Sequence, residues 1–175
     1  MDLKDKIRNI PDFPKKGIVF FDITTLIKDG EALRYSVDLM ADQYKGKKID
    51  AIMGAESRGF IFGAAMAYKL GVGFIPVRKP GKLPYKTCQV SYDLEYGSSS
   101  LEMHIDAIKK GENILVVDDL IATGGTAKAM AQIIEQMGGN VVGFSFLVEL
   151  SFLNPRKVLE GYDVQALVAY DSEKM

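Results

Sequence analysis

Few residues that build metal clusters or disulfide frameworks occur in this chain. It contains one histidine, His104, one cysteine, Cys88, and no tryptophan. A single cysteine excludes an internal disulfide, and a single histidine excludes a histidine metal cluster and leaves little material for a Ser/His/Asp triad. We expect His104 to be a surface residue on a strand. Any chemistry must therefore rest mainly on carboxylates, basic side chains and main-chain groups.

The chain also has no charge excess and no long apolar run. Lys and Arg number 22 against 23 Asp and Glu, so the chain offers no overall electrostatic footprint for nucleic acid, and any anion site must be local. No apolar run approaches the roughly 18 residues of a membrane span, and the first ten residues carry charges where a signal peptide is apolar. We expect a soluble, cytoplasmic protein. Its 175 residues and 47% hydrophobic content fit one domain.

Apolar residues alternate between helical and strand spacing along the chain. Near-continuous apolar strands alternating with helices predict a mostly parallel sheet covered on both faces, which is an α/β fold. The predicted strands are 49–53, 72–77, 114–117, 141–150 and 164–169. The predicted helices are 33–44, 60–70 and 130–137, ending near glycines 46, 71 and 138. Ligands of such sheets bind outside the carboxyl ends of the strands.

Two adjacent carboxylates and a TGGT turn follow the strand 114–117. The backbone N–H groups of 123–126 lie between strand and helix, where they can surround an anion at the helix N-terminus. Asp118 and Asp119 suit a neutral, hydroxyl-bearing part of the same ligand, because carboxylates accept hydrogen bonds from vicinal hydroxyls. A ribose phosphate meets both demands. The alternative is a helix cap beside a solvated Asp pair.

The stretch VVDDLIATGGT closely resembles the phosphoribosyl pyrophosphate signature of the type I phosphoribosyltransferases. Further segments, spread from Pro11 to Thr126, are similar to those of the members that act on adenine: PDFPKKGIVFFDITTLIKD, GAESRGFIFG, RKPGKLPYKT and YDLEYGSSSLEMH. The resemblance implies the type I phosphoribosyltransferase fold as a single domain over 1–175, with a hood from the N-terminal segment and a flexible β-hairpin lid at about 80–105. It also implies transfer of a phosphoribosyl group to a purine, with Mg²⁺ bound mainly through pyrophosphate and ribose oxygens.

The resemblance assigns roles residue by residue. The ribose and its phosphate fall to Asp118, Asp119, Ala122, Thr123, Gly124, Gly125 and Thr126. Pyrophosphate falls to Ser57, Arg58, Arg78, Lys79 and Lys82, with a non-proline cis peptide just before Ser57. Adenine falls to Val19, Phe20, Phe21 and Tyr96, and catalysis to Glu95 and Arg58. A homodimer is also implied, which would place some of these basic residues near the neighbouring subunit's site.

A lid is chemically reasonable, because an activated ribosyl centre reacts with water unless solvent is excluded. Apolar and polar residues alternate over 90–96 and again over 101–105 around the turn GSSS, which predicts a β-hairpin. In the resemblance Glu95 manages a proton on the purine; without it, Glu95 is an ordinary polar strand residue. Similarly, 17–23 matches a base-binding segment but also fits a core strand, and Phe21 stands where many members carry a basic residue.

Three functions are compatible with these motifs. The first is phosphoribosyl transfer to adenine, giving AMP and pyrophosphate. The second is transfer to another purine base, such as hypoxanthine or xanthine, which would share the DDLIATGGT stretch and differ in the base pocket. The third is a regulator that senses phosphoribosyl pyrophosphate without turnover. The sequence shows neither an appended DNA-binding segment nor a basic surplus, and this disfavours the third.

Overall fold

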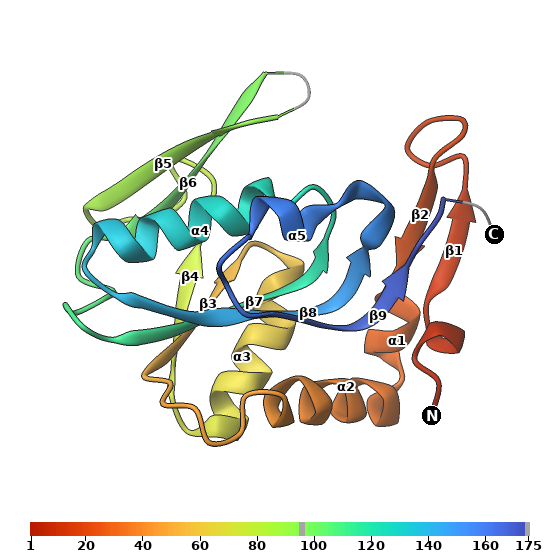
Figure 1. Cartoon of the computed structure of the whole chain (residues 1–175), viewed down its shortest axis with the longest axis horizontal. Helices are drawn as coiled ribbons and strands as arrows, with labels where there is room; N and C mark the ends of the chain where they lie inside the picture. The colour runs from red at the N-terminus through yellow and green to blue at the C-terminus, as the bar shows by residue number, and fades with distance from the viewer. Residues whose placement is uncertain (95–96, 174–175) are drawn as a thin grey trace.

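A five-stranded sheet forms the centre of the molecule. A computed structural model describes residues 1–94 and 97–173. The strand order is β4-β3-β7-β8-β9, and all four pairings are parallel (Figure 1). The strands are β3 (Ala51–Ala55), β4 (Gly73–Val77), β7 (Asn113–Ile121), β8 (Asn140–Leu150) and β9 (Val164–Tyr170). The predicted α/β class, with a parallel sheet between helices, is confirmed.

Helices cover both faces of this sheet. On one face lie α2 (Gly30–Asp42) and α3 (Arg58–Leu70), and on the other lie α4 (Gly125–Gln136) and the short α5 (Pro155–Val158) (Figure 1). Alternate residues of β7 enter the two cores, Ile114 and Val116 on the α4 side and Leu115 and Val117 on the α2–α3 side. Burial on both faces explains why the strands read as unbroken apolar runs.

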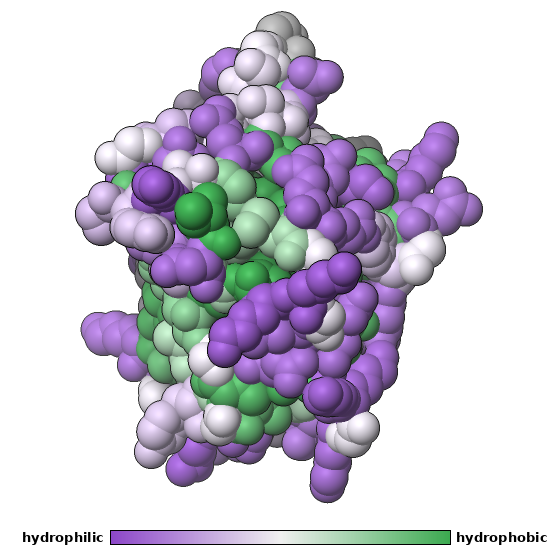
Figure 2. Space-filling model, turned by 90° about the vertical axis from the view of Figure 1, so that its left-hand side faces the viewer, coloured by the Kyte–Doolittle hydropathy of each residue, from purple (hydrophilic) through white to green (hydrophobic). Residues whose placement is uncertain are grey.

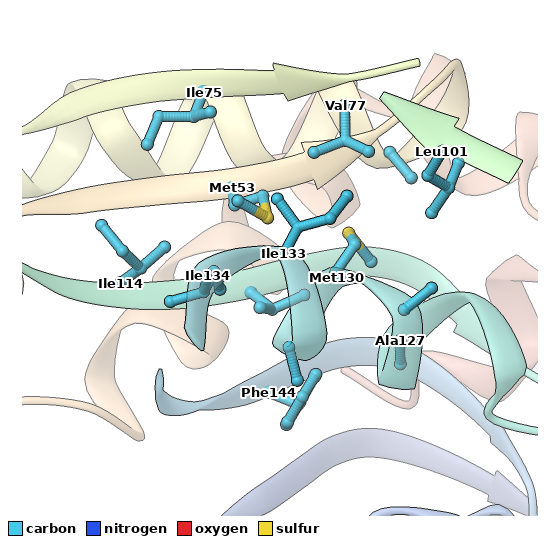
Figure 3. Close-up of a cluster of buried hydrophobic side chains, with 14 of the residues drawn as sticks. Met53, Ile75, Val77, Leu101, Ile114, Ala127, Met130, Ile133, Ile134 and Phe144 are labelled. Atoms are coloured by element: carbon cyan, nitrogen blue, oxygen red, sulfur yellow. The ribbon is translucent and has the colours of Figure 1, made fainter. Parts of the chain in front are cut away.

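The α4 core fixes the start of that helix over the sheet. Figure 3 shows one face of α4 directed toward side chains from β3, β7 and β8. Met130, Ile133 and Ile134 of this face are fully buried, so their 3.6-residue spacing correctly predicted the helix. A helix held this firmly gives the preceding loop, 122–124, a rigid support.

Two antiparallel hairpins lie outside the central sheet. One joins β1 (Arg8–Pro11) to β2 (Val19–Asp22), followed by α1 (Thr24–Lys28), and the other joins β5 (Thr87–Asp93) to β6 (Ser98–His104). They lie at opposite ends of the molecule in Figure 1, and the β5–β6 hairpin projects above the body in Figure 2. The predicted hairpin is therefore present, but Ser98, Ser99 and Ser100 belong to β6 rather than to the turn.

The structure also corrects the predicted end of β7. This strand runs on through Asp118 and Asp119 to Ile121, because β8 continues to pair with it as far as the pair Ile121–Glu149. The Asp pair thus lies inside a strand and does not follow it. Sequence periodicity did not predict β1, α1, α5 or the two 3₁₀ turns (Lys4–Lys6 and Ser151–Leu153). Among the described residues, no helix combines the length and apolar character that a membrane crossing requires.

Candidate active site

A cavity of about 240 Å³ opens at the carboxyl ends of β3 and β7. It brings together residues that lie more than 60 positions apart in the sequence. The predicted site residues that line it are Ser57, Arg58, Lys79, Asp118, Asp119, Ala122, Thr123, Gly124, Gly125 and Thr126. This is the edge of the sheet at which a parallel α/β fold is expected to bind ligands.

The loop before α4 is shaped by its glycines. Gly124 has φ +92°, and a Cβ there would lie 3.2 Å from the Pro155 carbonyl oxygen, so α5 closely covers this side. A Cβ at Gly125 would lie 3.4 Å from the Tyr92 ring. No side chain among the described residues caps the N-terminus of α4, so its first N–H groups face the cavity without a side-chain acceptor. The loop therefore has the geometry of an anion site.

The two aspartates differ in their partners. Asp119 is 4% exposed, and its Oδ2 lies 2.8 Å from Arg58 Nε. Asp118 Oδ1 accepts a hydrogen bond of 2.9 Å from the Asp119 N–H and packs against Gly59, where a Cβ would approach it to 2.6 Å. Burial raises the pKa of Asp118 well above its ordinary value, and the Asp119 carboxylate raises it further. Arg58 thus pairs directly with Asp119, while its charge offsets the rise in the pKa of Asp118 only in part.

Ser57 lies in the turn between β3 and α3, and Arg58 is the first residue of α3. The peptide bond between Glu56 and Ser57 is cis, as the resemblance implied. Arg58 reaches from this turn in two directions, because its guanidinium also lies 5.7 Å from the centre of the Phe20 ring in the β1–β2 hairpin. Arg58 therefore connects the Asp pair to the segment that the sequence suggested for the base.

Glu56 organises the basic segment that follows β4, a role that no local sequence signal indicates. Its carboxylate accepts hydrogen bonds from Lys82 Nζ at 2.9 Å, Arg78 at 3.3 Å and the Lys79 backbone N–H at 2.7 Å. Burial raises the pKa of Glu56, but the hydrogen bonds from Lys82 and the Lys79 N–H, with the nearby charges, lower it to about 2. Arg78 and Lys82 thus turn toward the Ser57–Arg58 turn, although neither lines the cavity itself.

The Lys79 side chain points elsewhere. Its Nζ lies 2.5 Å from the Ser99 hydroxyl and 3.2 Å from the Tyr92 hydroxyl, both in the β5–β6 hairpin. The Tyr92 hydroxyl in turn accepts a hydrogen bond of 3.3 Å from the Thr126 hydroxyl. Burial raises the pKa of Tyr92, and hydrogen bonding with Ser99, Thr126 and Lys79 lowers it by more, so the pKa lies below its ordinary value. Sequence reasoning assigned no role to Tyr92, although Tyr92 is the first residue of the segment YDLEYGSSSLEMH.

The proposed base-binding residues lie in the β1–β2 hairpin. The Phe21 side chain is 5% exposed and stacks on Tyr170, with ring centres 3.9 Å apart, so it is turned into the protein. Pro11 pairs with Val19 but has no N–H to donate. Pro11 and Val19 therefore cannot exchange both hydrogen bonds of a hydrogen-bonded antiparallel pair. Glu95 and Tyr96 lie outside the described residues.

Comparison with known proteins identifies the family. A family model described as "Phosphoribosyl transferase domain" matches residues 24–163. The adenine phosphoribosyltransferase of Brachyspira hyodysenteriae is 62% identical over 170 residues, covering 97% of this chain and all of that protein. This chain belongs to the adenine phosphoribosyltransferase family. The family assignment confirms the resemblance that VVDDLIATGGT indicated.

Solved structures of the family agree with this fold. The crystal structure of adenine phosphoribosyltransferase from Thermoanaerobacter pseudethanolicus has a TM-score of 0.94 at 54% identity, covering 96% of this chain and 98% of the other. The enzyme from Saccharomyces cerevisiae, complexed with adenine and an imino-altritol bisphosphate, has a TM-score of 0.88 at 40% identity, covering 94% and 95%. The type I phosphoribosyltransferase fold expected from the sequence is thus confirmed.

Proposed function

We propose that this protein catalyses transfer of the phosphoribosyl group of phosphoribosyl pyrophosphate to adenine, giving AMP and pyrophosphate in purine salvage. One observation carries the proposal: the anion-binding loop 123–126, the Asp pair and Arg58 share one cavity at the carboxyl end of the sheet. A ligand that fits all three has a phosphate, vicinal hydroxyls and a second anionic group. Full-length relatives named adenine phosphoribosyltransferase support adenine as the base.

We assign the sugar end of the substrate to β7 and the loop after it. The 5′-phosphate binds the N–H groups of 123–126 at the N-terminus of α4, where the helix dipole favours negative charge. Ala122 contributes at the start of this loop. The ribose 2′- and 3′-hydroxyls donate hydrogen bonds to Asp118 and Asp119. Because Arg58 now occupies Asp119 at 2.8 Å, binding of the ribose exchanges this ion pair for ribose contacts.

The leaving group requires positive charge at the other end. As the bond between C1 of the ribose and the pyrophosphate oxygen breaks, negative charge grows on pyrophosphate, and donors placed there beforehand stabilise it. Ser57 and Arg58, with Arg78 and Lys82, form this group in our assignment. Arg58 is also assigned a catalytic role, because its guanidinium, once released from Asp119, can stabilise the negative charge that develops on the departing pyrophosphate.

We propose Mg²⁺ as the cofactor. Two adjacent carboxylates, Asp118 and Asp119, offer the oxygen donors that Mg²⁺ prefers, and no group of three or more potential ligand side chains occurs among the described residues. Such a donor set fits an ion that takes most of its ligands from water and from pyrophosphate and ribose oxygens. When bound, Mg²⁺ neutralises charge on pyrophosphate.

The base enters between the β1–β2 hairpin and the sheet in this proposal. The main chain of Val19 and Phe21 forms hydrogen bonds with the edge of adenine, and the Phe20 ring and Tyr96 provide apolar contact. A ring nitrogen of adenine attacks C1 and loses its proton. Glu95 accepts that proton, for which it must come within about 3 Å of the nitrogen. The β5–β6 hairpin acts as the lid that excludes water.

We further propose a cytoplasmic homodimer. The cytoplasmic location follows from the substrate, because phosphoribosyl pyrophosphate carries several charges and does not cross membranes unaided. Support for a dimer comes from apolar surface between α2 and α3, lined by Leu33, Val37 and Ala65 and by Tyr68, which is 91% exposed. Figure 2 shows further hydrophobic residues exposed below the β5–β6 hairpin. Sedimentation of the protein and of Tyr68→Glu tests the assembly; an unchanged mass would remove α3 from the interface.

Product analysis tests the reaction itself. The protein is mixed with Mg²⁺, phosphoribosyl pyrophosphate and adenine, hypoxanthine, guanine or xanthine in separate reactions. We expect AMP from adenine and little nucleotide from the 6-oxopurines, because a mismatched amino or carbonyl group left unpaired loses about 1–3 kcal/mol. Nucleotide from a 6-oxopurine instead would reassign the base pocket. Binding without any product would favour a sensor of phosphoribosyl pyrophosphate.

A further inference from the structure

The basic segment after β4 divides its cations between two places. Arg78 and Lys82 form hydrogen bonds with Glu56 beside the Ser57–Arg58 turn. The Lys79 backbone N–H also binds Glu56, at 2.7 Å, but its side chain crosses to Ser99 and Tyr92. Lys79 is thus held at both ends, its main chain by Glu56 and its ammonium by the β5–β6 hairpin.

Tyr92 connects this ammonium to the phosphate loop. Its hydroxyl lies 3.2 Å from Lys79 Nζ and 3.3 Å from the Thr126 hydroxyl, and its ring packs against Gly125. Lys79 Nζ also lies 5.6 Å from the centre of the same ring. Tyr92 therefore links the Lys79 ammonium to Thr126, in the loop assigned to the phosphate, through two successive hydrogen bonds.

The contacts have a physical consequence for binding. A free lysine side chain populates many rotamers, and ordering it on binding opposes affinity. Here Tyr92 and Ser99, which are cross-strand partners in the β5–β6 hairpin, already hold the ammonium in place. When a phosphate arrives, the Thr126 hydroxyl can turn its hydrogen to the anion and accept from Tyr92, since a hydroxyl can both donate and accept.

We propose that Tyr92 is a positioning residue that holds the Lys79 ammonium at the 5′-phosphate end of the site, rather than at the pyrophosphate end. The inference rests on the proposed assignment of the loop 123–126 to the 5′-phosphate. It assigns Lys79 to a different part of the substrate from Arg78 and Lys82. The two anionic ends of phosphoribosyl pyrophosphate then each have their own cations, and the β5–β6 hairpin supplies the group that orients one of them.

Two fragments of the substrate allow the 5′-phosphate site and the pyrophosphate site to be tested separately. Ribose 5-phosphate carries only the phosphate for the loop, and inorganic pyrophosphate carries only the other anion. Calorimetric titration, with Mg²⁺ present throughout, gives the Kd of each fragment for the full-length protein and for Tyr92→Phe and Lys79→Gln. We expect Lys79→Gln to weaken ribose 5-phosphate about 10-fold and Tyr92→Phe about 5-fold, as for loss of a charge-assisted contact, with pyrophosphate changed less than 2-fold.

A double variant tests whether Tyr92 acts through Lys79. If it does, adding Tyr92→Phe to Lys79→Gln weakens ribose 5-phosphate no further, whereas independent contributions multiply. Ser91→Ala is the matched control, because Ser91 and Ser100 form the neighbouring cross-strand hydroxyl pair at 2.9 Å, and neither residue lines the cavity. It should leave both Kd values unchanged.

The outcomes separate this inference from the site assignment. Equal or larger weakening of pyrophosphate in Tyr92→Phe, or unchanged binding of both fragments, would overturn the role of Tyr92 while leaving the site in place. A lower melting temperature with unchanged Kd values would make Tyr92 purely structural. If the unaltered protein binds neither fragment, the phosphate loop assignment fails and this inference fails with it.

Discussion

Replacing Gly59 with alanine should separate the stability of the fold from the geometry of the site. Gly59 lies in the first turn of α3, where alanine is ordinarily favoured over glycine by about 1 kcal/mol. A Cβ at this position would lie 2.6 Å from Asp118 Oδ1, whereas ordinary contacts begin at 3.4 Å. The Asp118 carboxylate must therefore move by about 0.8 Å, which also strains its 2.9 Å hydrogen bond from the Asp119 N–H.

The expected effect of this shift on stability is small, and its expected effect on catalysis is large. A weakened hydrogen bond costs about 1 kcal/mol, which the gain in helix propensity roughly offsets, so the melting temperature should change by only a few degrees. A misplacement of about 1 Å in a group that orients substrate lowers rates by about 100-fold. We therefore expect kcat/KM for phosphoribosyl pyrophosphate to fall by about 10- to 100-fold in Gly59→Ala.

Two other glycines provide controls on the same side of the sheet. Gly30, at the start of α2, has open space around its Cβ position, so Gly30→Ala should keep kcat/KM and raise stability by the helix propensity alone, about 1 kcal/mol. A Cβ at Gly63 would lie 2.6 Å from the Phe74 ring, so Gly63→Ala should lower stability while the folded protein keeps its kcat/KM. Steady-state kinetics and thermal unfolding of all three variants give the comparison. A kcat/KM within 3-fold of the parent in Gly59→Ala would refute the role given to Asp118.

The remaining predictions concern charge. Asp119→Asn should lower kcat/KM about 100-fold in steady-state kinetics, because it removes a ribose acceptor and leaves Arg58 without its partner; near-normal kinetics would contradict the assignment. Glu95→Gln should lower kcat more than it raises KM, and an unchanged kcat would exclude Glu95 from proton transfer. The folded-state pKa of Glu56, about 2, lies below its ordinary 4.5, so its contribution to stability is present above about pH 4.5 and disappears as the pH falls toward 2. Urea unfolding at stepwise lower pH should show a shallower loss in Glu56→Gln, and parallel curves would exclude this linkage.

The long periodic elements were predictable because their signal is local. The helical spacing of Met130, Ile133 and Ile134 is visible in the sequence, and so is the apolar run of β8. β1 (Arg8–Pro11) gave no such signal, because three of its four residues are exposed and, within the described part of the chain, it pairs only with β2. The helices α1 and α5 have five and four residues, too few to show a 3.6-residue period.

In the site, too, the residues with a local sequence signal were predictable and those that depend on long-range contacts were not. The residues that the sequence suggested from one contiguous stretch, Asp118, Asp119 and the loop 123–126, share one cavity. The groups that orient them were not found, because their partners come from other segments: Glu56 meets Lys82, 26 positions away. Tyr92 likewise reaches the loop 34 positions further along, and no spacing rule predicts such a contact.

The adjacent aspartates explain how this site is kept ready for a charged ligand. Two neighbouring carboxylates inside a strand repel each other, and the protein limits that repulsion by pairing Asp119 with Arg58 and by raising the pKa of Asp118. In the basic segment after β4, Glu56 forms ion pairs with Arg78 and Lys82. Each internal pair keeps a buried charge from being left unpartnered, which would cost several kcal/mol. Under the proposed function, the ribose and the pyrophosphate would exchange partners with these internal pairs, and the binding free energy of these two parts of the substrate would be set by the difference between the two sets of partners.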